Sequence, residues 1–242
     1  MMGTIFNTNR NNGFTLIEIL IALSISTIVM SALYQAFNSQ QKSYVIQENV
    51  SAMQQNIRGA VLMMTREIRE AGCDPTETSN AGILVATVGQ LRFTLDIAGD
   101  TATGAHDGDT DDSNENITFG FSNSNDADAN GIADGGGADW SSPQDLGRNS
   151  GGGFQPIAEN IEAIEFSYIL ADGTITTAPV LLNEIRAVQI SLLARASTAL
   201  NKNFGIQTTT YRTAFGAFWG PFNDNFQRRF STTTIQCRNL GY

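Results

Sequence analysis

The sequence predicts an α+β protein in which a long N-terminal helix packs on an antiparallel β-sheet head. Three observations lead to this prediction. An apolar run from Phe14 to about Phe37 is followed by apolar residues at helical spacing. Short segments of alternating hydrophobicity begin near Ile83 and continue to the C-terminus. Because no clear helical pattern separates those segments, we expect the strands to pair in antiparallel fashion.

Length and charge limit the classes of function. The 242 residues are 41% hydrophobic and 16% charged, which permits one membrane anchor and one globular head of ordinary size. The formal net charge of −10 argues against a broad basic surface, so we predict no nucleic-acid partner. Much of the acidity lies between Asp96 and Asp145 and therefore describes one region rather than a whole surface.

The apolar run of residues 14–37 is long enough to cross a membrane, since it would measure ~36 Å as a helix. It lacks the several basic residues before it and the small-x-small site after it that are typical of a secretory signal peptide. Its one charged residue is Glu18. A carboxylate within lipid costs ~2.5–3.5 kcal/mol or more, so we expect Glu18 to have a partner and a function. The alternative is a plain anchor that happens to contain a glutamate.

The helix is predicted to continue beyond the anchor to residue 72. Apolar residues recur there at intervals of three and four and form one stripe, which we expect to pack on the sheet. Gly72 and Pro75 predict the end of the helix. The residues of the stripe are Ile46, Val50, Met53, Ile57, Val61, Met64 and Ile68.

Residues 73–242 form the predicted β-rich head. Asp172-Gly173 is typical of a hairpin turn between two of its strands. The expected strands are Ile83–Thr87, Leu91–Ile97, Ile117–Ser122, Ile164–Leu170, Thr174–Thr177, Ile185–Ala196, Tyr211–Phe218 and Phe230–Cys237.

The segment Gly13–Glu18 (GFTLIE) resembles the processing motif of type IV prepilins and type II secretion pseudopilins. The resemblance implies that residues 1–13 are a leader and that a prepilin peptidase cuts after Gly13 and methylates the new amine of Phe14. It also implies that Glu18 neutralises the N-terminal amine of a neighbouring subunit in a filament. The leader departs from the commonest form of the family because it contains one basic residue, Arg10.

The C-terminal segment Arg228–Asn239 resembles the last strand of PilW-type minor pilins, which have a basic pair, a threonine run and Arg-Asn. The resemblance implies a type IV pilin-like fold and a minor pilin that acts in initiating pilus assembly. A type II secretion pseudopilin at a pseudopilus tip is the alternative in the same class. Arg228, Arg229 and Arg238 are interpreted either as solvated residues at a strand edge or as specific contacts.

Partners and location follow from the same resemblance. It implies the prepilin peptidase, other minor and major pilins, and the inner-membrane assembly platform as partners. Before assembly the chain would be a single-pass inner-membrane protein with a periplasmic head. Afterwards it would lie in the pilus filament, near the tip.

Residues 98–155 form an acidic, glycine-rich insertion in the head. Part of it matches the first half of an EF-hand-like calcium loop, with Gly131 at the turn position, but the bidentate glutamate at position 12 is missing. We expect either a calcium site or a solvated loop, and a calcium-stabilised adhesive head with exposed Trp140 or Phe154 is a further alternative function. No other cofactor is required. The candidate ligands are Asp126, Asp128, Asn130, the carbonyl of Ile132, and Asp134.

Two cysteines and one histidine complete the candidate sites. Cys73 and Cys237 lie at opposite ends of the head and are expected to form a disulfide or to remain buried thiols. The one histidine, His106, lies in the acidic insertion without a serine elbow or a reactive-cysteine motif. We therefore expect a structural protein rather than an enzyme.

Overall fold

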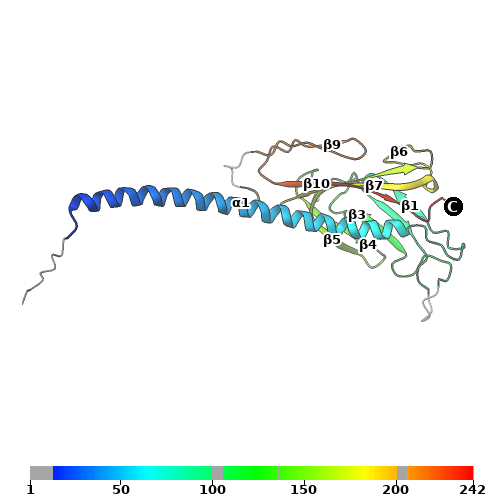
Figure 1. Ribbon diagram of the computed structural model, residues 1–242. Coiled ribbons are helices and arrows are strands. Elements are labelled where there is room, and N and C mark those ends of the chain that lie inside the picture. The colour runs from blue at the N-terminus through cyan, green and yellow to red at the C-terminus, as the bar shows by residue number, and fades with distance from the viewer. Residues whose placement is uncertain (1–12, 100–105, 136, 201–205, 242) are drawn as a thin grey trace, which may run out of the picture. The chain divides into compact units, whose positions relative to one another are not determined.

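The structure is a computed structural model and describes residues 13–99, 106–135, 137–200 and 206–241 (Figure 1). The chain divides into two units, residues 1–47 and 48–242. One helix, α1 (Leu16–Glu70), begins in the first unit and ends in the second. Gly72, two residues beyond it, has a φ of 75°, which suits the left-handed residue that commonly follows a helix.

The second unit contains a sheet of eight antiparallel strands in the order β1-β2-β3-β4-β5-β7-β10, with β6 beside β5 (Figure 1). A second, two-stranded sheet is formed by β8 (Tyr211–Arg212) and β9 (Phe218–Trp219). A 3-10 helix, η1 (Leu182–Glu184), precedes β7. The strands of the large sheet are β1 (Ile83–Ala86), β2 (Leu91–Thr94), β3 (Asn116–Gly120), β4 (Gln144–Asn149), β5 (Phe154–Leu170), β6 (Ile175–Thr176), β7 (Ile185–Arg195) and β10 (Arg228–Gln236).

The C-terminal part of α1 packs on one face of this sheet, which confirms the predicted fold class. Its buried residues follow the predicted spacing, although the centre of the stripe runs through Ala60 while Val61 is only half-buried. The cyan part of α1 runs along the sheet in Figure 1. The buried helix residues are Met53, Ile57, Ala60, Met64 and Ile68.

The opposite face of the sheet is covered by a cluster of aromatic residues. Ile164 of β5 and Leu192 of β7 face the helix, whereas their neighbours Ala163 and Leu193 belong to this second cluster. The alternation is that of a strand, whose successive side chains point to opposite faces. Trp219 of β9 is buried in the cluster. The other aromatic residues packed there are Trp140, Tyr211, Phe222 and Phe230.

Two parts of the head differ from the prediction. Tyr211–Phe218 is not one strand but the hairpin of β8 and β9, closed by a bond from Thr213 N to Ala217 O around Gly216, whose φ is 110°. In the acidic insertion, β3 coincides with the predicted strand Ile117–Ser122, whereas β4 and the start of β5 are parts of the large sheet that were not predicted. β4 has a single large apolar residue, Leu146, so its sequence shows no alternating pattern and resembles that of a loop.

Candidate functional site

Glu18 lies in the first turn of α1, where its side chain is bound by Thr15. Glu18 Oε2 accepts hydrogen bonds from Thr15 N and Thr15 Oγ1, both at 2.8 Å. Thr15 Oγ1 in turn accepts a bond of 3.3 Å from Glu18 N. This reciprocal pair is a capping box, which satisfies backbone donors at the helix start. The sequence signal is Thr-x-x-Glu, and Thr15 was not among the predicted site residues.

The helix that follows Glu18 presents apolar side chains in every direction. From Leu16 to Phe37 the exposed large apolar residues each expose at least 50% of their surface. By length and composition, α1 is the one helix in the described residues that could cross a membrane. Gly13 and Phe14 precede the helix and are exposed, and residues 1–12 of the predicted leader lie outside the described residues. The predicted cut site is therefore on accessible, non-helical chain.

Residues 8–34 match the family described as "Prokaryotic N-terminal methylation motif". The chain carries that motif. Gly13, Phe14 and Glu18 all lie inside the matched range. Among solved structures the chain is similar to the type IV-like pilin TTHA1219 from Thermus thermophilus, with 12% identity, 81% of this chain and 97% of that chain covered, and a TM-score of 0.42. A comparison with curated proteins found no significant match.

The candidate calcium loop docks on β5. Ile132 forms a bridge with Ala163, and Gly131, with a φ of 82°, lies so close to β5 that a Cβ would overlap the carbonyl oxygen of Ile164. Backbone amides of the loop itself donate hydrogen bonds to the Asp126 carboxylate, whose Oδ2 accepts one from Gly131 N at 2.9 Å. Asn130 Oδ1 likewise accepts from Ile132 N at 2.7 Å. Gly131 therefore lies in a left-handed turn that packs against β5.

Asp126 is buried, and burial raises its pKa to about 6. Asp134 is also buried and accepts from Ala127 N at 3.0 Å, whereas Asp128 is exposed and binds Asn130. Within the described ranges, no group of three or more His, Cys, Asp or Glu side chains is placed to hold a metal ion. Calcium binding therefore stays a prediction, and Asn130 and the Ile132 carbonyl would have to complete the ligand set.

The cysteines are both free, so the structure does not contain the predicted Cys73–Cys237 disulfide. Burial raises the pKa of Cys237 to about 12, and burial together with the nearby Asp96 carboxylate raises that of Cys73. The C-terminal tail nevertheless reaches the end of α1, because Asn239 Nδ2 donates to Glu70 O at 3.1 Å. The pairing of the two thiols stays a prediction.

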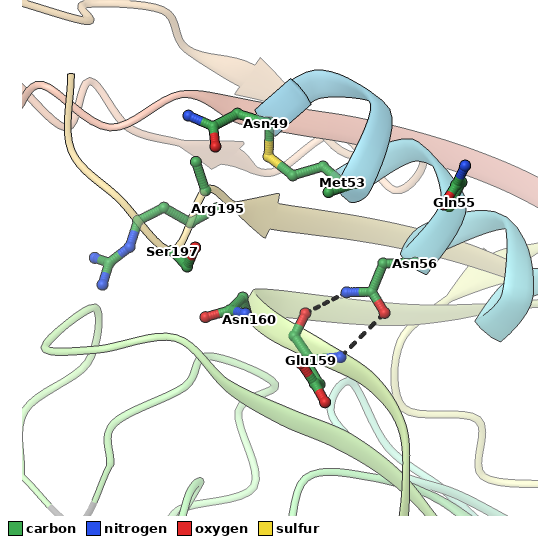
Figure 2. Close-up of a pocket in the computed structure, with 10 residues that line it drawn as sticks. Asn49, Met53, Gln55, Asn56, Glu159, Asn160, Arg195 and Ser197 are labelled. Atoms are coloured by element: carbon green, nitrogen blue, oxygen red, sulfur yellow. Dashed lines mark hydrogen bonds between the residues drawn. The ribbon is translucent and has the colours of Figure 1, made fainter. Parts of the chain in front are cut away.

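A polar cavity of about 420 Å³ lies where residues 49–56 of α1 meet residues 159–160 of β5 and the C-terminal end of β7 (Figure 2). The side-chain amide of Asn56 spans the Glu159 backbone, accepting from its N at 3.2 Å and donating to its O. Asn160 and Ser197 also line the cavity. No sequence motif predicts this cavity, and the bonds of Asn56 to the Glu159 backbone hold α1 to β5.

A buried ion cluster fixes the start of β10 to β5. The Arg228 side chain is 2% exposed, and its Nε and Nη2 donate to Glu162 at 2.5 and 2.9 Å. Arg228 also donates to Asp224 at 2.6 Å, and Arg195 donates to Glu162 at 3.1 Å. The interpretation of Arg228 as a solvated residue was therefore wrong. Its guanidinium lies 3.8 Å from the ring centroid of Phe222 and helps to hold the aromatic cluster in place.

Proposed function

We infer that this chain is a minor pilin that acts in type IV pilus assembly and is processed by a prepilin peptidase after Gly13. The observation that carries the proposal is a methylation motif over residues 8–34 that overlaps an exposed apolar helical run, residues 16–37, with one acidic residue, Glu18. The helix would anchor the chain in the inner membrane before assembly. The head would then present its surface to other minor and major pilins.

The capping box explains how a single chain tolerates Glu18 in lipid. Two donors from Thr15 bond to one oxygen of the carboxylate, which lowers the cost of burying it without a countercharge. Cleavage after Gly13 would create a positive amine on Phe14. When a second subunit packs alongside, that amine and the carboxylate of its neighbour would attract strongly in a medium of low dielectric constant. Assembly would thus exchange an internal cap for an intermolecular ion pair.

A type II secretion pseudopilin has the same N-terminal motif, so the choice between the two filaments depends on the head. The resemblance of Arg228–Asn239 to PilW-type minor pilins supports the pilus. The two aromatic residues of the adhesive alternative differ, because Trp140 packs in the aromatic cluster with its ring centroid 5.0 Å from that of Phe222, whereas Phe154 is exposed. Recovery of the chain with the major pilin in sheared surface filaments supports the pilus, whereas recovery with pseudopilins alone refutes it.

Processing is tested with Gly13→Ala in cells that contain the peptidase. A Cβ at Gly13 would meet no atom within 4 Å, so the substitution should change recognition and leave the fold intact. Gly59→Ala in α1 is a matched control, since a Cβ there also meets no atom within 4 Å. We expect Gly59→Ala to migrate as the cleaved form and Gly13→Ala as the longer precursor. Equal mobility of the two variants contradicts the proposal.

A further inference from the structure

β10 is an edge strand that lacks the usual protection against pairing with another chain. It pairs with β7 over nine consecutive residues without a bulge, and in the described part of the chain no strand pairs with its other side. Between Arg229 and Gln236 it contains neither proline nor a charged residue. Native edges are commonly blunted by charges, proline or bulges, so this edge is open to strand addition.

The register identifies the backbone groups that face outward. Ala196 N donates to Gln227 O and Cys237 N donates to Arg186 O, so the odd-numbered residues of β10 make the ladder with β7. The even-numbered residues direct their N–H and C=O groups to the opposite side. Among the described residues, no backbone partner outside the sheet bonds to these groups. We call them the free edge: Arg228, Phe230, Thr232, Thr234 and Gln236.

An exposed arginine stands near each end of the free edge. Arg229 and Arg238 are exposed, and neither makes an ion pair in the described part of the chain, in contrast to the buried Arg228. The two arginines are nine positions apart, which corresponds to about 30 Å of extended chain. Two unneutralised positive charges on a chain with a net charge of −10 mark this edge as locally basic. A partner segment with acidic residues at both ends would match them.

We propose that β10 accepts an extended segment of another protein as an additional strand, about nine residues long and acidic at both ends. Main-chain hydrogen bonds along the free edge supply the affinity, and Arg229 and Arg238 select the acidic ends. A second copy of β10 fits less well, because antiparallel pairing of two copies brings their arginines together at each end. The inference rests on the head alone and does not depend on processing at Gly13 or on the filament role.

The test uses the full chain in detergent micelles and two fluorescent synthetic peptides. Both have a core of alternating threonine and valine, and one is flanked by aspartates while the other is flanked by lysines. Fluorescence anisotropy should show the acidic peptide binding about tenfold more tightly than the basic one. Arg229→Glu combined with Arg238→Glu should reverse that preference. Equal affinities, or no binding of the acidic peptide, overturn the proposal.

Hydrogen exchange on the same complex locates the peptide. Binding should slow exchange of the outward amides of Phe230, Thr232 and Thr234 by at least about tenfold, since each acquires an acceptor. Thr232→Pro removes one outward donor at an edge position that tolerates proline, so it should keep the melting temperature and lose binding. Binding by Thr232→Pro at wild-type affinity, or self-association of the chain that blocks the peptide, refutes the acidic partner strand.

Discussion

Replacing Glu18 by glutamine separates the two roles that the structure gives this side chain. A single carboxylate oxygen, Oε2, accepts both bonds from Thr15, each at 2.8 Å. The carbonyl oxygen of glutamine can accept the same two bonds, so Glu18→Gln keeps the cap and removes the charge. Glu18→Ala removes both. The stability of the first turn of α1 should therefore differ between the two variants by the contribution of one helix cap, about 1 kcal/mol.

The charge should matter far more to assembly than the cap. Removing one partner of a buried ion pair costs about 3–5 kcal/mol, because the remaining charge is left uncompensated. At about 1.4 kcal/mol per tenfold, this lowers association of the subunit with the filament by about two to three and a half orders of magnitude. Glu18→Gln and Glu18→Ala should both be cleaved normally and both be nearly absent from filaments.

The assay is quantitative immunoblotting of sheared filaments against the membrane fraction, with mass spectrometry to confirm cleavage. Thr15→Ala is the matched control, because it removes the Thr15 hydroxyl that donates to Glu18 Oε2 and accepts from Glu18 N, and leaves the carboxylate of Glu18 in place. It should enter filaments much better than Glu18→Gln. If Glu18→Gln instead enters filaments like the wild type while Glu18→Ala does not, the carboxylate serves only as a helix cap and the ion-pair mechanism is refuted.

Three further predictions concern the head. Arg228→Met should lower its free energy of unfolding by about 3–5 kcal/mol by leaving Glu162 short of a buried partner, and a melting temperature equal to that of the wild type contradicts this. Calcium should raise the melting temperature of the full chain, and Asp126→Ala with Asp128→Ala should abolish that rise. A melting temperature that does not change with calcium concentration contradicts the calcium site. Because burial raises the pKa of Asp126 to about 6, the folded head takes up a proton that the unfolded chain does not, so this group's contribution to stability should rise as pH falls from 7 to 5. Urea unfolding at both pH values, compared with Asp126→Ala, measures that contribution, and identical pH dependence in the two proteins argues against it.

Periodicity predicted the parts of the fold that bury a continuous apolar surface. The stripe from Met53 to Ile68 and the alternating residues of β5 and β7 became the two sides of one core. β4 could not be predicted in this way, since its burial depends on glycine and arginine placed between neighbouring strands. The hairpin of β8 and β9 was missed because a single glycine, Gly216, interrupts a run that otherwise resembles a strand.

Local motifs predicted the N-terminal site, whereas contacts between residues far apart in the chain could not be predicted. Gly13, Phe14 and Glu18 are adjacent in the chain, so their pattern is readable without a structure. Arg228 reads as a solvated residue until the fold brings Glu162, 66 positions earlier, to within 2.5 Å. The edge position of β10 is equally hidden, because strand order cannot be deduced from alternation within a strand.

The most direct test of the account is mass spectrometry of the mature N-terminus after recovery of the chain from its host. The account predicts that the chain begins at Phe14, that the α-amine of Phe14 carries a methyl group, and that residues 1–13 are absent. A chain that keeps Met1 in cells with an active prepilin peptidase contradicts the account.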